Sequence, residues 1–233
     1  MPQHRLAATA LLAIGIVGGV RATVPDEADS SIRQFLAQDY TQPAYRATRR
    51  LEAENGVRRG WIEAVTEYSP KTGFRYEITD EGGSNHIRTK VLRAVLDGER
   101  DVIALGEAAR SSLDRGNYTF QPNGVDDEGL ANVLLVPRRK ERVLVAGTMF
   151  LQPADGDLVR LQGRLAKSPS FWIKNVDITR SYERIGGVVV PVTLESTAQV
   201  RLLGPASLRM TYIYSEVDGH PVGSTAASST SSR

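Results

Sequence analysis

Few residues of this 233-residue chain have the types and spacing that catalysis requires. Beyond residue 22 the histidines are His86 and His220, and the chain has no cysteine. Neither His-Glu-x-x-His nor a cysteine pair occurs, so the sequence predicts no metal site. A Gly-x-Ser-x-Gly motif and a glycine-rich phosphate loop are also absent, because Gly186-Gly187 separates two expected strands rather than a strand and a helix. We therefore expect neither an enzyme nor a bound cofactor.

Two acidic clusters and one pair of glutamates are weaker candidates for a functional site. Asp126-Asp127-Glu128 and Asp155-Gly156-Asp157 lack the spaced oxygens and the glycine of a calcium loop, so we interpret both as turns. Glu63 and Glu67 share one face of an expected strand, which makes a carboxylate pair geometrically possible. No partner acid or base accompanies them, so this pair indicates a polar sheet face.

The charge of the chain argues against a general nucleic-acid binder. The formal net charge is +2, and it includes Arg5 and Arg21, which lie in a segment that we expect to be removed. One compact basic cluster, Arg138-Arg139-Lys140 followed by Arg142, lies between two expected strands. It fits a solvated loop that blunts strand pairing, and it also fits a contact to acidic head groups or to a partner.

The first 22 residues have the pattern of a cleaved signal peptide. His4 and Arg5 precede an apolar run over residues 6–20, and Val20-Arg21-Ala22 offers small residues for cleavage after Ala22. The run is short for a membrane span, and an uncleaved anchor is the alternative. No cysteine follows, so we expect no lipid anchor by that route. We predict a periplasmic location, one domain over residues 23–218 and a disordered Ser/Thr-rich tail over residues 219–233.

We expect the strands that carry these positions to form an antiparallel meander, in which consecutive strands are neighbours. In the longest strand pattern, over residues 188–203, Val190, Val192 and Leu194 fall on one parity with polar residues between most of them. A strand of this length needs neighbours on both sides. Turn signals such as Asp155-Gly156 and Gly186-Gly187 connect it to further strands, predicted over 142–151, 157–165, 171–184 and 207–217.

The upstream half adds strands and amphipathic helices. Asn55-Gly56 is the strongest hairpin signal, and Ile32 and Phe35 mark a helical stripe before it. We predict helices over 25–38, 86–96 and 99–113, and strands over 45–54, 57–68, 74–79, 118–121 and 131–137. The fold class is α+β, mainly β: a curved antiparallel sheet, or unclosed half-barrel, covered by amphipathic helices.

A wide, curved sheet has a concave face that its own side chains do not fill, and a helical cover would leave a hydrophobic cavity. The alternative is that the same residues pack against one another as an ordinary core. The predicted lining residues are Trp61, Phe74, Tyr76, Ile87, Val91, Leu92, Val95, Met149, Trp172, Met210 and Tyr212.

Several motifs follow one another in a recognisable order. They are Gly60-Trp61-Ile62-Glu63-Ala64-Val65, Phe74-Arg75-Tyr76-Glu77 and Leu134-Leu135-Val136-Pro137-Arg138-Arg139-Lys140. With an N-terminal helix and later long strands, this order resembles the LolA-like lipoprotein-carrier superfamily, which includes the LolA and LolB carriers and the RseB/MucB periplasmic sensors. The resemblance implies a half-barrel lidded by helices, and it implies that Arg75 holds the lid if it matches the family's strand arginine. The pattern departs from the carriers where residues 88–97 read as helix instead of a hairpin.

These expectations favour a periplasmic carrier that binds a lipid or a lipoprotein acyl chain without covalent chemistry. Burial of apolar surface, about 0.8 kcal/mol per methylene, would drive uptake. The alternative is an RseB-like sensor that reports envelope stress to a membrane-bound partner protein through its cavity or an exposed strand edge. Nucleic acid is not an expected partner.

Overall fold

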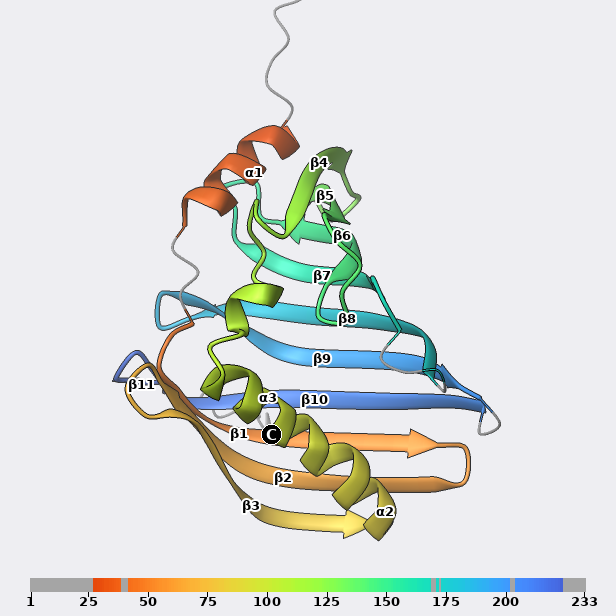
Figure 1. Ribbon diagram of the computed structural model, residues 1–233. Helices are drawn as coiled ribbons and strands as arrows, with labels where there is room; N and C mark the ends of the chain where they lie inside the picture. The colour runs from red at the N-terminus through yellow and green to blue at the C-terminus, as the bar shows by residue number, and fades with distance from the viewer. Residues whose placement is uncertain (1–26, 39–41, 169–170, 172, 202–203, 224–233) are drawn as a thin grey trace, which may run out of the picture.

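The computed structural model describes residues 27–38, 42–168, 171, 173–201 and 204–223. One antiparallel sheet runs through it in the order β3-β2-β1-β10-β9-β8-β7-β6-β5-β4, and β11 pairs with β10 outside this path. β3 and β4 form the two ends of this sheet, so the described strands make an open, curved half-barrel (Figure 1). The predicted fold class is confirmed.

Alternating patterns and glycine turns define the strands. Gly56, in the hairpin between β1 and β2, has a φ of +63°, which a residue with a side chain rarely adopts. The strands are β1 (Tyr45–Asn55), β2 (Arg58–Ser69), β3 (Gly73–Gly83), β4 (Tyr118–Val125), β5 (Ala131–Pro137), β6 (Val145–Leu151), β7 (Leu158–Leu165), β8 (Ile173–Ile185), β9 (Val188–Val200), β10 (Gly204–Val217) and β11 (His220–Pro221).

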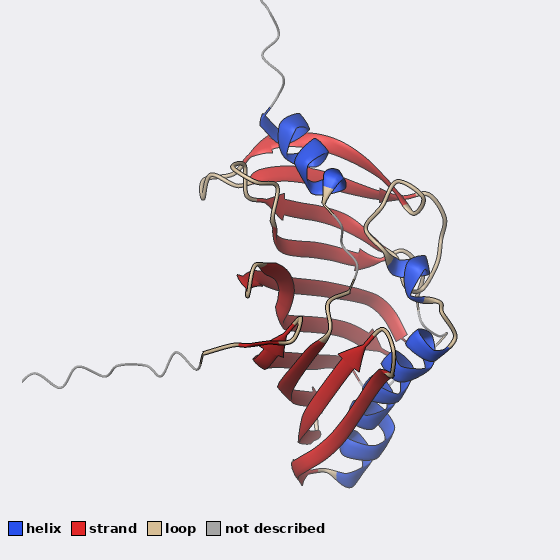
Figure 2. Cartoon of the chain, turned by 90° about the vertical axis from the view of Figure 1, so that its left-hand side faces the viewer, coloured by secondary structure: helices blue, strands red, loops and turns tan. Residues whose placement is uncertain are grey.

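The helices lie on the concave face of the sheet (Figure 2). α1 (Glu27–Ala37) packs on β4, β5 and β6. A second helical run begins with α2 (Asn85–Ile87), passes through the π-helical turn η1 (Arg88–Leu92) and continues as α3 (Arg93–Ala104) across β1, β2 and β3. A single 3-10 turn, η2 (Ala108–Ser111), follows in the connection to β4. Among the described residues, no helix has the length and apolar character needed to cross a membrane.

The buried side chains form two separate clusters, one under each helix. The α3 cluster consists of Tyr45, Ala47, Leu51, Ala53, Ile62, Ala64, Phe74, Ile87, Leu92, Leu96, Val190, Met210, Tyr214 and Val217. The α1 cluster consists of Ala28, Ile32, Phe35, Tyr118, Ala131, Val133, Leu135, Leu144, Met149, Leu151, Leu158 and Leu161.

Three of the predicted elements need correction. The helix expected over 99–113 does not form as a separate helix: α3 continues through residue 99 and ends at Ala104, because Gly106 with a φ of +69° accepts the left-handed conformation that closes a helix. β3 extends to Gly83, through residues predicted as a turn. Residues 219–223, predicted as the start of a disordered tail, belong to the described part and include β11. The predicted signal peptide lies outside the described residues.

Candidate functional site

The helical run of α2, η1 and α3 is anchored to the sheet at its N-terminal end. Ile87, Leu92 and Leu96 are at most 1% exposed and point into the α3 cluster. At the start of the run the helix approaches β2 closely, since a Cβ on Gly60 would lie only 3.1 Å from the Cβ of Ile87. Apolar contact and close packing therefore fix this end of the helix.

Beyond Leu96 the attachment of α3 is mainly polar, and Ile103 adds a partly buried apolar contact to the α3 cluster. Leu96 is the only fully buried residue of α3 itself. The Tyr76 hydroxyl donates a hydrogen bond of 2.8 Å to Asp97 Oδ1. Two residues further on, Arg49 of β1 donates two hydrogen bonds to the Glu99 carboxylate, of 2.6 Å from Nη1 to Oε2 and 3.0 Å from Nη2 to Oε1. A two-pronged ion pair thus holds the C-terminal half of α3 down on the sheet.

Arg49 is the most unusual residue under α3, because its charged side chain is only 2% exposed. Its guanidinium carbon lies 4.6 Å from the ring centre of Tyr212, 5.1 Å from that of Phe74 and 5.5 Å from that of Tyr45. Its Nη2 also donates a hydrogen bond to the Tyr45 hydroxyl. Its Nε is buried without a hydrogen-bond partner among the described residues. This aromatic cage stabilises a cation that is shielded from water.

Neighbouring side chains keep Arg49 positively charged. Burial alone would lower its pKa, but the adjacent Tyr212 and Glu99 outweigh burial and raise the pKa. Burial in turn raises the pKa of Tyr212 above its ordinary value, so this hydroxyl stays protonated at neutral pH. Arg49 is therefore a permanent cation facing neutral phenols and one carboxylate.

A second cation, Arg180 of β8, lies on the same concave face. In the sheet it pairs with Leu161 of β7 and Leu194 of β9, which pack into the α1 cluster and the α3 cluster respectively. The interaction with Tyr182, followed by that with Tyr212, raises the pKa of Arg180 against the opposing effect of burial. The half-buried Arg180 therefore marks a polar seam between two apolar clusters.

We define the seam by Arg49, Glu99, Arg180, Tyr182 and Tyr212. Sequence reasoning missed four of its members, Arg49, Glu99, Arg180 and Tyr182. A usable signal exists in the strand parity: Arg49 interrupts the inward series of Tyr45, Ala47, Leu51 and Ala53 in β1. A cation in an otherwise apolar parity is a candidate functional residue, because burying it is costly.

The structure brings most of the predicted lining residues together, but in two places. Met149 belongs to the α1 cluster, on the other side of the seam. The remaining predicted residues that contact one another around the α3 cluster are Phe74, Tyr76, Ile87, Val91, Leu92, Val95, Met210 and Tyr212. These side chains fill much of the space beneath the helix by packing on one another.

Two predicted positions do not face the helix. Trp61 lies on the opposite face of the sheet from Ile62, and its ring covers the Arg50 guanidinium at 4.2 Å. Arg75 also points outward, where it is 65% exposed and 3.6 Å from Glu67. The two-residue period of β2 and β3 explains both corrections, since their neighbours Ile62, Phe74 and Tyr76 take the inward positions. Trp172 lies outside the described residues.

Two open grooves lie near these elements. One, of about 580 Å³, runs between the edge strand β3 and α3 and is lined by Tyr76, Ile78, Thr79, Asp80, Glu81 and Arg93. The other, of about 390 Å³, is lined by Gln152, Asp157, Leu158, Val159, Tyr182, Glu183, Arg184 and Val189. The second groove reaches Tyr182, so it borders the seam.

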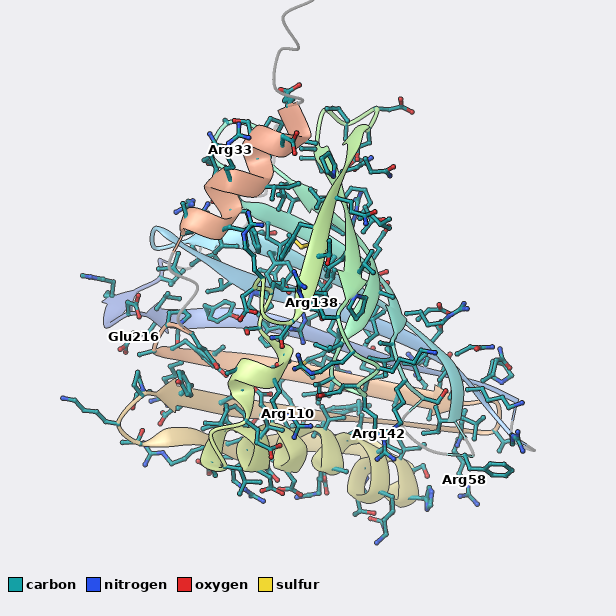
Figure 3. The ribbon with its side chains drawn as sticks, turned by 45° about the horizontal axis from the view of Figure 1, so that its top comes forward. Arg33, Arg58, Arg110, Arg138, Arg142 and Glu216 are labelled. Atoms are coloured by element: carbon teal, nitrogen blue, oxygen red, sulfur yellow. The ribbon has the colours of Figure 1, made fainter. Side chains whose placement is uncertain are left out.

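The basic cluster predicted at 138–142 joins the connection that follows α3. Arg110 of η2 and Arg139 both contact Glu141, at 3.2 and 2.5 Å. Arg138 and Arg142 flank this contact, and the labelled side chains of Arg110, Arg138 and Arg142 are seen in Figure 3. The hydrogen bonds and charge pairing with Arg139 and Arg110 lower the pKa of Glu141. Part of this cluster is therefore neutralised within the chain.

No group of three or more metal-ligating side chains occurs in the described part of the chain. The glutamates Glu63 and Glu67 face outward, where Glu67 pairs with Arg46 at 3.0 Å. The seam, with its two arginines, one carboxylate and two phenols, is the strongest candidate site because burial and charge coincide there.

Comparisons with known proteins do not show a family for this chain. No protein-family model matches the chain, and no curated protein matches it. Among solved structures, a DUF1329 family protein from Desulfovibrio piger is similar over 80% of this chain and 90% of its own, with 8% sequence identity and a TM-score of 0.38.

Proposed function

We propose that this protein is a non-catalytic, periplasmic binding or carrier protein for a hydrophobic ligand, either a lipid or the acyl chain of a lipoprotein. The ligand would enter the concave face beneath α3. The last eight residues of α3, 97–104, act as a flap that lifts while Ile87, Leu92 and Leu96 remain in place. A distant kinship to LolA-like carriers is part of this proposal.

The proposal depends chiefly on how α3 is attached. One fully buried residue in a helix of 12 residues provides little apolar anchoring, whereas the Arg49–Glu99 pair and the Tyr76–Asp97 hydrogen bond are polar contacts that water can replace. The π-helical turn η1 lies within the anchored part, directly before α3 begins, and π-turns are frequent at functional sites. Lifting the flap would uncover the aromatic rings around Arg49.

Energetic magnitudes are compatible with reversible uptake. Each methylene of an acyl chain that leaves water contributes about 0.8 kcal/mol. Opening the flap costs the net value of one charged hydrogen-bonded pair and one phenol hydrogen bond, about 2–4 kcal/mol in total. A chain of a few buried methylenes therefore offsets the opening, and reclosure over a shorter or absent chain favours release.

A single introduced cysteine tests the flap, because the chain has no cysteine of its own. Ala104→Cys places an environment-sensitive dye on the exposed end of α3, and Ala146→Cys places the same dye on the exposed outer face of β6. Oleic acid or a diacylated lipopeptide should change the emission at position 104 and leave position 146 unchanged. Equal responses at both positions, or none at either with no ligand bound, would overturn the proposal.

Native mass spectrometry of the protein purified from a periplasm complements this test. Co-purifying lipid supports the carrier function. A co-purifying protein domain without lipid would instead favour the alternative of an envelope-stress sensor with a membrane-bound partner. A clean apo mass together with no fatty-acid binding would count against both.

A further inference from the structure

The seam contains one more positive than negative charge. Arg49 and Arg180 each carry +1, and Glu99 carries −1. The neighbouring phenols are neutral at pH 7, because burial raises the pKa of Tyr45, Tyr212 and Tyr214. Glu99 is committed to Arg49 through both of its oxygens. The net charge of the seam is therefore +1, and it is located on Arg180.

Arg180 has no carboxylate within 4.0 Å among the described residues. The position of Arg180 in the sheet makes the lack of a nearby carboxylate energetically important. The row of paired residues that crosses it runs from Leu161 through Arg180 to Leu194, Met210 and Leu51, and every other member is apolar. A cation placed between two apolar clusters without a counter-ion costs free energy that a bound anion would recover.

The surroundings of Arg180 fit a small anion rather than a further protein side chain. Tyr182 and Tyr212 both lie close enough to influence its charge, and their hydroxyl groups can donate hydrogen bonds. A guanidinium binds a planar carboxylate with two parallel hydrogen bonds. A single negative charge neutralises the seam, whereas a doubly charged phosphate would overcompensate it.

Apolar surface for a ligand tail adjoins this position on the side of α3. Leu194 and Met210 follow Arg180 in the row; Met210 belongs to the α3 cluster and Leu194 packs against it. A groove is also lined by Tyr182, two residues along β8 from Arg180. An amphiphile with one acidic group and one long apolar chain matches both features.

We propose that Arg180, assisted by Tyr182 and Tyr212, binds the carboxylate head group of a long-chain fatty acid whose tail lies beneath the flap of α3. This assignment rests on the proposed function and adds the ligand class to it. Glu99 keeps Arg49 neutralised in the closed state, so Arg180 is the residue that distinguishes an acid from an uncharged lipid.

The test compares three ligands of matched chain length on the full chain. Oleate, oleyl alcohol and dioleoyl phosphatidylglycerol are titrated below their aggregation concentrations, at pH 8, against the wild type, Arg180→Gln and the matched control Arg58→Gln. Arg58, labelled in Figure 3, is exposed at the start of β2, where it pairs with Asn55, six residues along β1 from Arg49. We expect oleate to bind the wild type and Arg58→Gln roughly tenfold more tightly than oleyl alcohol. Arg180→Gln should abolish that preference while the affinity for oleyl alcohol stays unchanged.

The outcomes separate this assignment from the function on which it rests. Equal binding of oleate and oleyl alcohol to the wild type, or an unchanged preference in Arg180→Gln, overturns the carboxylate site but leaves hydrophobic binding intact. Tight binding of phosphatidylglycerol with weak binding of oleate also overturns it, in favour of a phosphodiester head group. Absence of binding by all three ligands defeats the proposed function itself.

A second variant guards against loss of folding. Tyr182→Phe removes one hydroxyl and keeps the ring, so the fold should be retained. We expect it to weaken oleate roughly threefold and to leave oleyl alcohol unaffected. If Tyr182→Phe and Arg180→Gln both retain the full preference for oleate, Arg180 is not the head-group residue.

Discussion

The two helices cover the two ends of the same sheet, but they are attached in different ways. α1 buries four of its 11 residues, Ala28, Ser31, Ile32 and Phe35, and its remaining attachment includes hydrogen bonds from Gln38 to the turn at Asp155 and Asp157. α3 buries only Leu96 of its 12 residues and depends on an ion pair and a phenol hydrogen bond. One helix is part of the core, whereas half of the other is held by contacts that can exchange with water.

The strands beneath the helices repeat this difference. The α1 cluster is apolar except for Tyr118, whose hydroxyl accepts a hydrogen bond of 3.1 Å from the Val145 N–H group. The strands under α3 contain a buried arginine and a group of tyrosines around it. Stability does not require such a group, since apolar side chains of similar volume often serve as well or better. Its presence on one side only indicates that function, rather than folding, explains the residues under α3.

The largest expected effect is on the α1 side. Phe35→Ala removes a ring that is 1% exposed and lies 6.1 Å from the ring of Phe120. The resulting cavity should lower the free energy of unfolding by about 4 kcal/mol, measured by urea denaturation. Ligand affinity of the folded fraction should not change. A loss below about 1 kcal/mol would show that α1 is as loosely attached as the end of α3.

The second expectation concerns alkaline pH. Burial raises the pKa of Tyr45 and of Tyr214 well above the ordinary value near 10. Between pH 10 and the folded-state pKa, the unfolded chain has released these protons and the folded chain retains them, so stability is full below pH 10 and falls as pH rises. The slope should be about 3 kcal/mol per pH unit for the two groups together.

Urea denaturation at several pH values between 9 and 11 measures this slope. Tyr214→Phe should reduce it by about 1.4 kcal/mol per pH unit, because one of the raised tyrosines no longer titrates. A stability that does not change with pH in this interval would contradict the burial of the tyrosines beneath α3.

A third expectation concerns the ion pair itself. Glu99→Gln leaves the buried Arg49 without a counter-charge and should cost about 2 kcal/mol, because Glu99 is partly exposed and glutamine still accepts one hydrogen bond. The same change should speed the entry of a fluorescent fatty acid, measured by stopped-flow. Replacing both partners, Arg49→Met with Glu99→Leu, should restore most of the stability. If the double variant is less stable than Glu99→Gln, the pair is a folding element rather than a latch.

The smallest expected effect again concerns the α1 cluster. Tyr118→Phe leaves the Val145 N–H group without its acceptor and should cost about 1 kcal/mol in urea denaturation. Oleate and lipopeptide binding should remain at wild-type values. A measurable loss of binding would extend the site across the seam and weaken the contrast between the two halves.

Sequence periodicity predicted most of this architecture and only part of the site. The hairpin at Asn55-Gly56 and the long strands from residue 131 onward form near their predicted bounds, because alternation and glycine turns are local signals. Trp61 is predicted as a lining residue and, by family resemblance, Arg75 as a lid contact, whereas the structure places both on the face opposite Ile62 and Phe74.

The seam could not be predicted in the same way. Arg49 and Glu99 are 50 residues apart, and Arg180 is a further 81 residues along, so only the sheet order brings them together. The end of α3 was likewise not predictable from the sequence pattern. Its amphipathic pattern predicted continued helix, whereas Gly106 ends the helix and leaves Leu105 73% exposed.

Hydrogen exchange resolved to individual peptides tests the mobility of the flap most directly. We expect the amides of residues 97–104 to exchange through local opening, at least tenfold faster than those of α1 and independently of global unfolding, and to become protected when oleate is added. Exchange of α3 and α1 at the same rate, with no protection by ligand, would contradict a movable cover over the concave face.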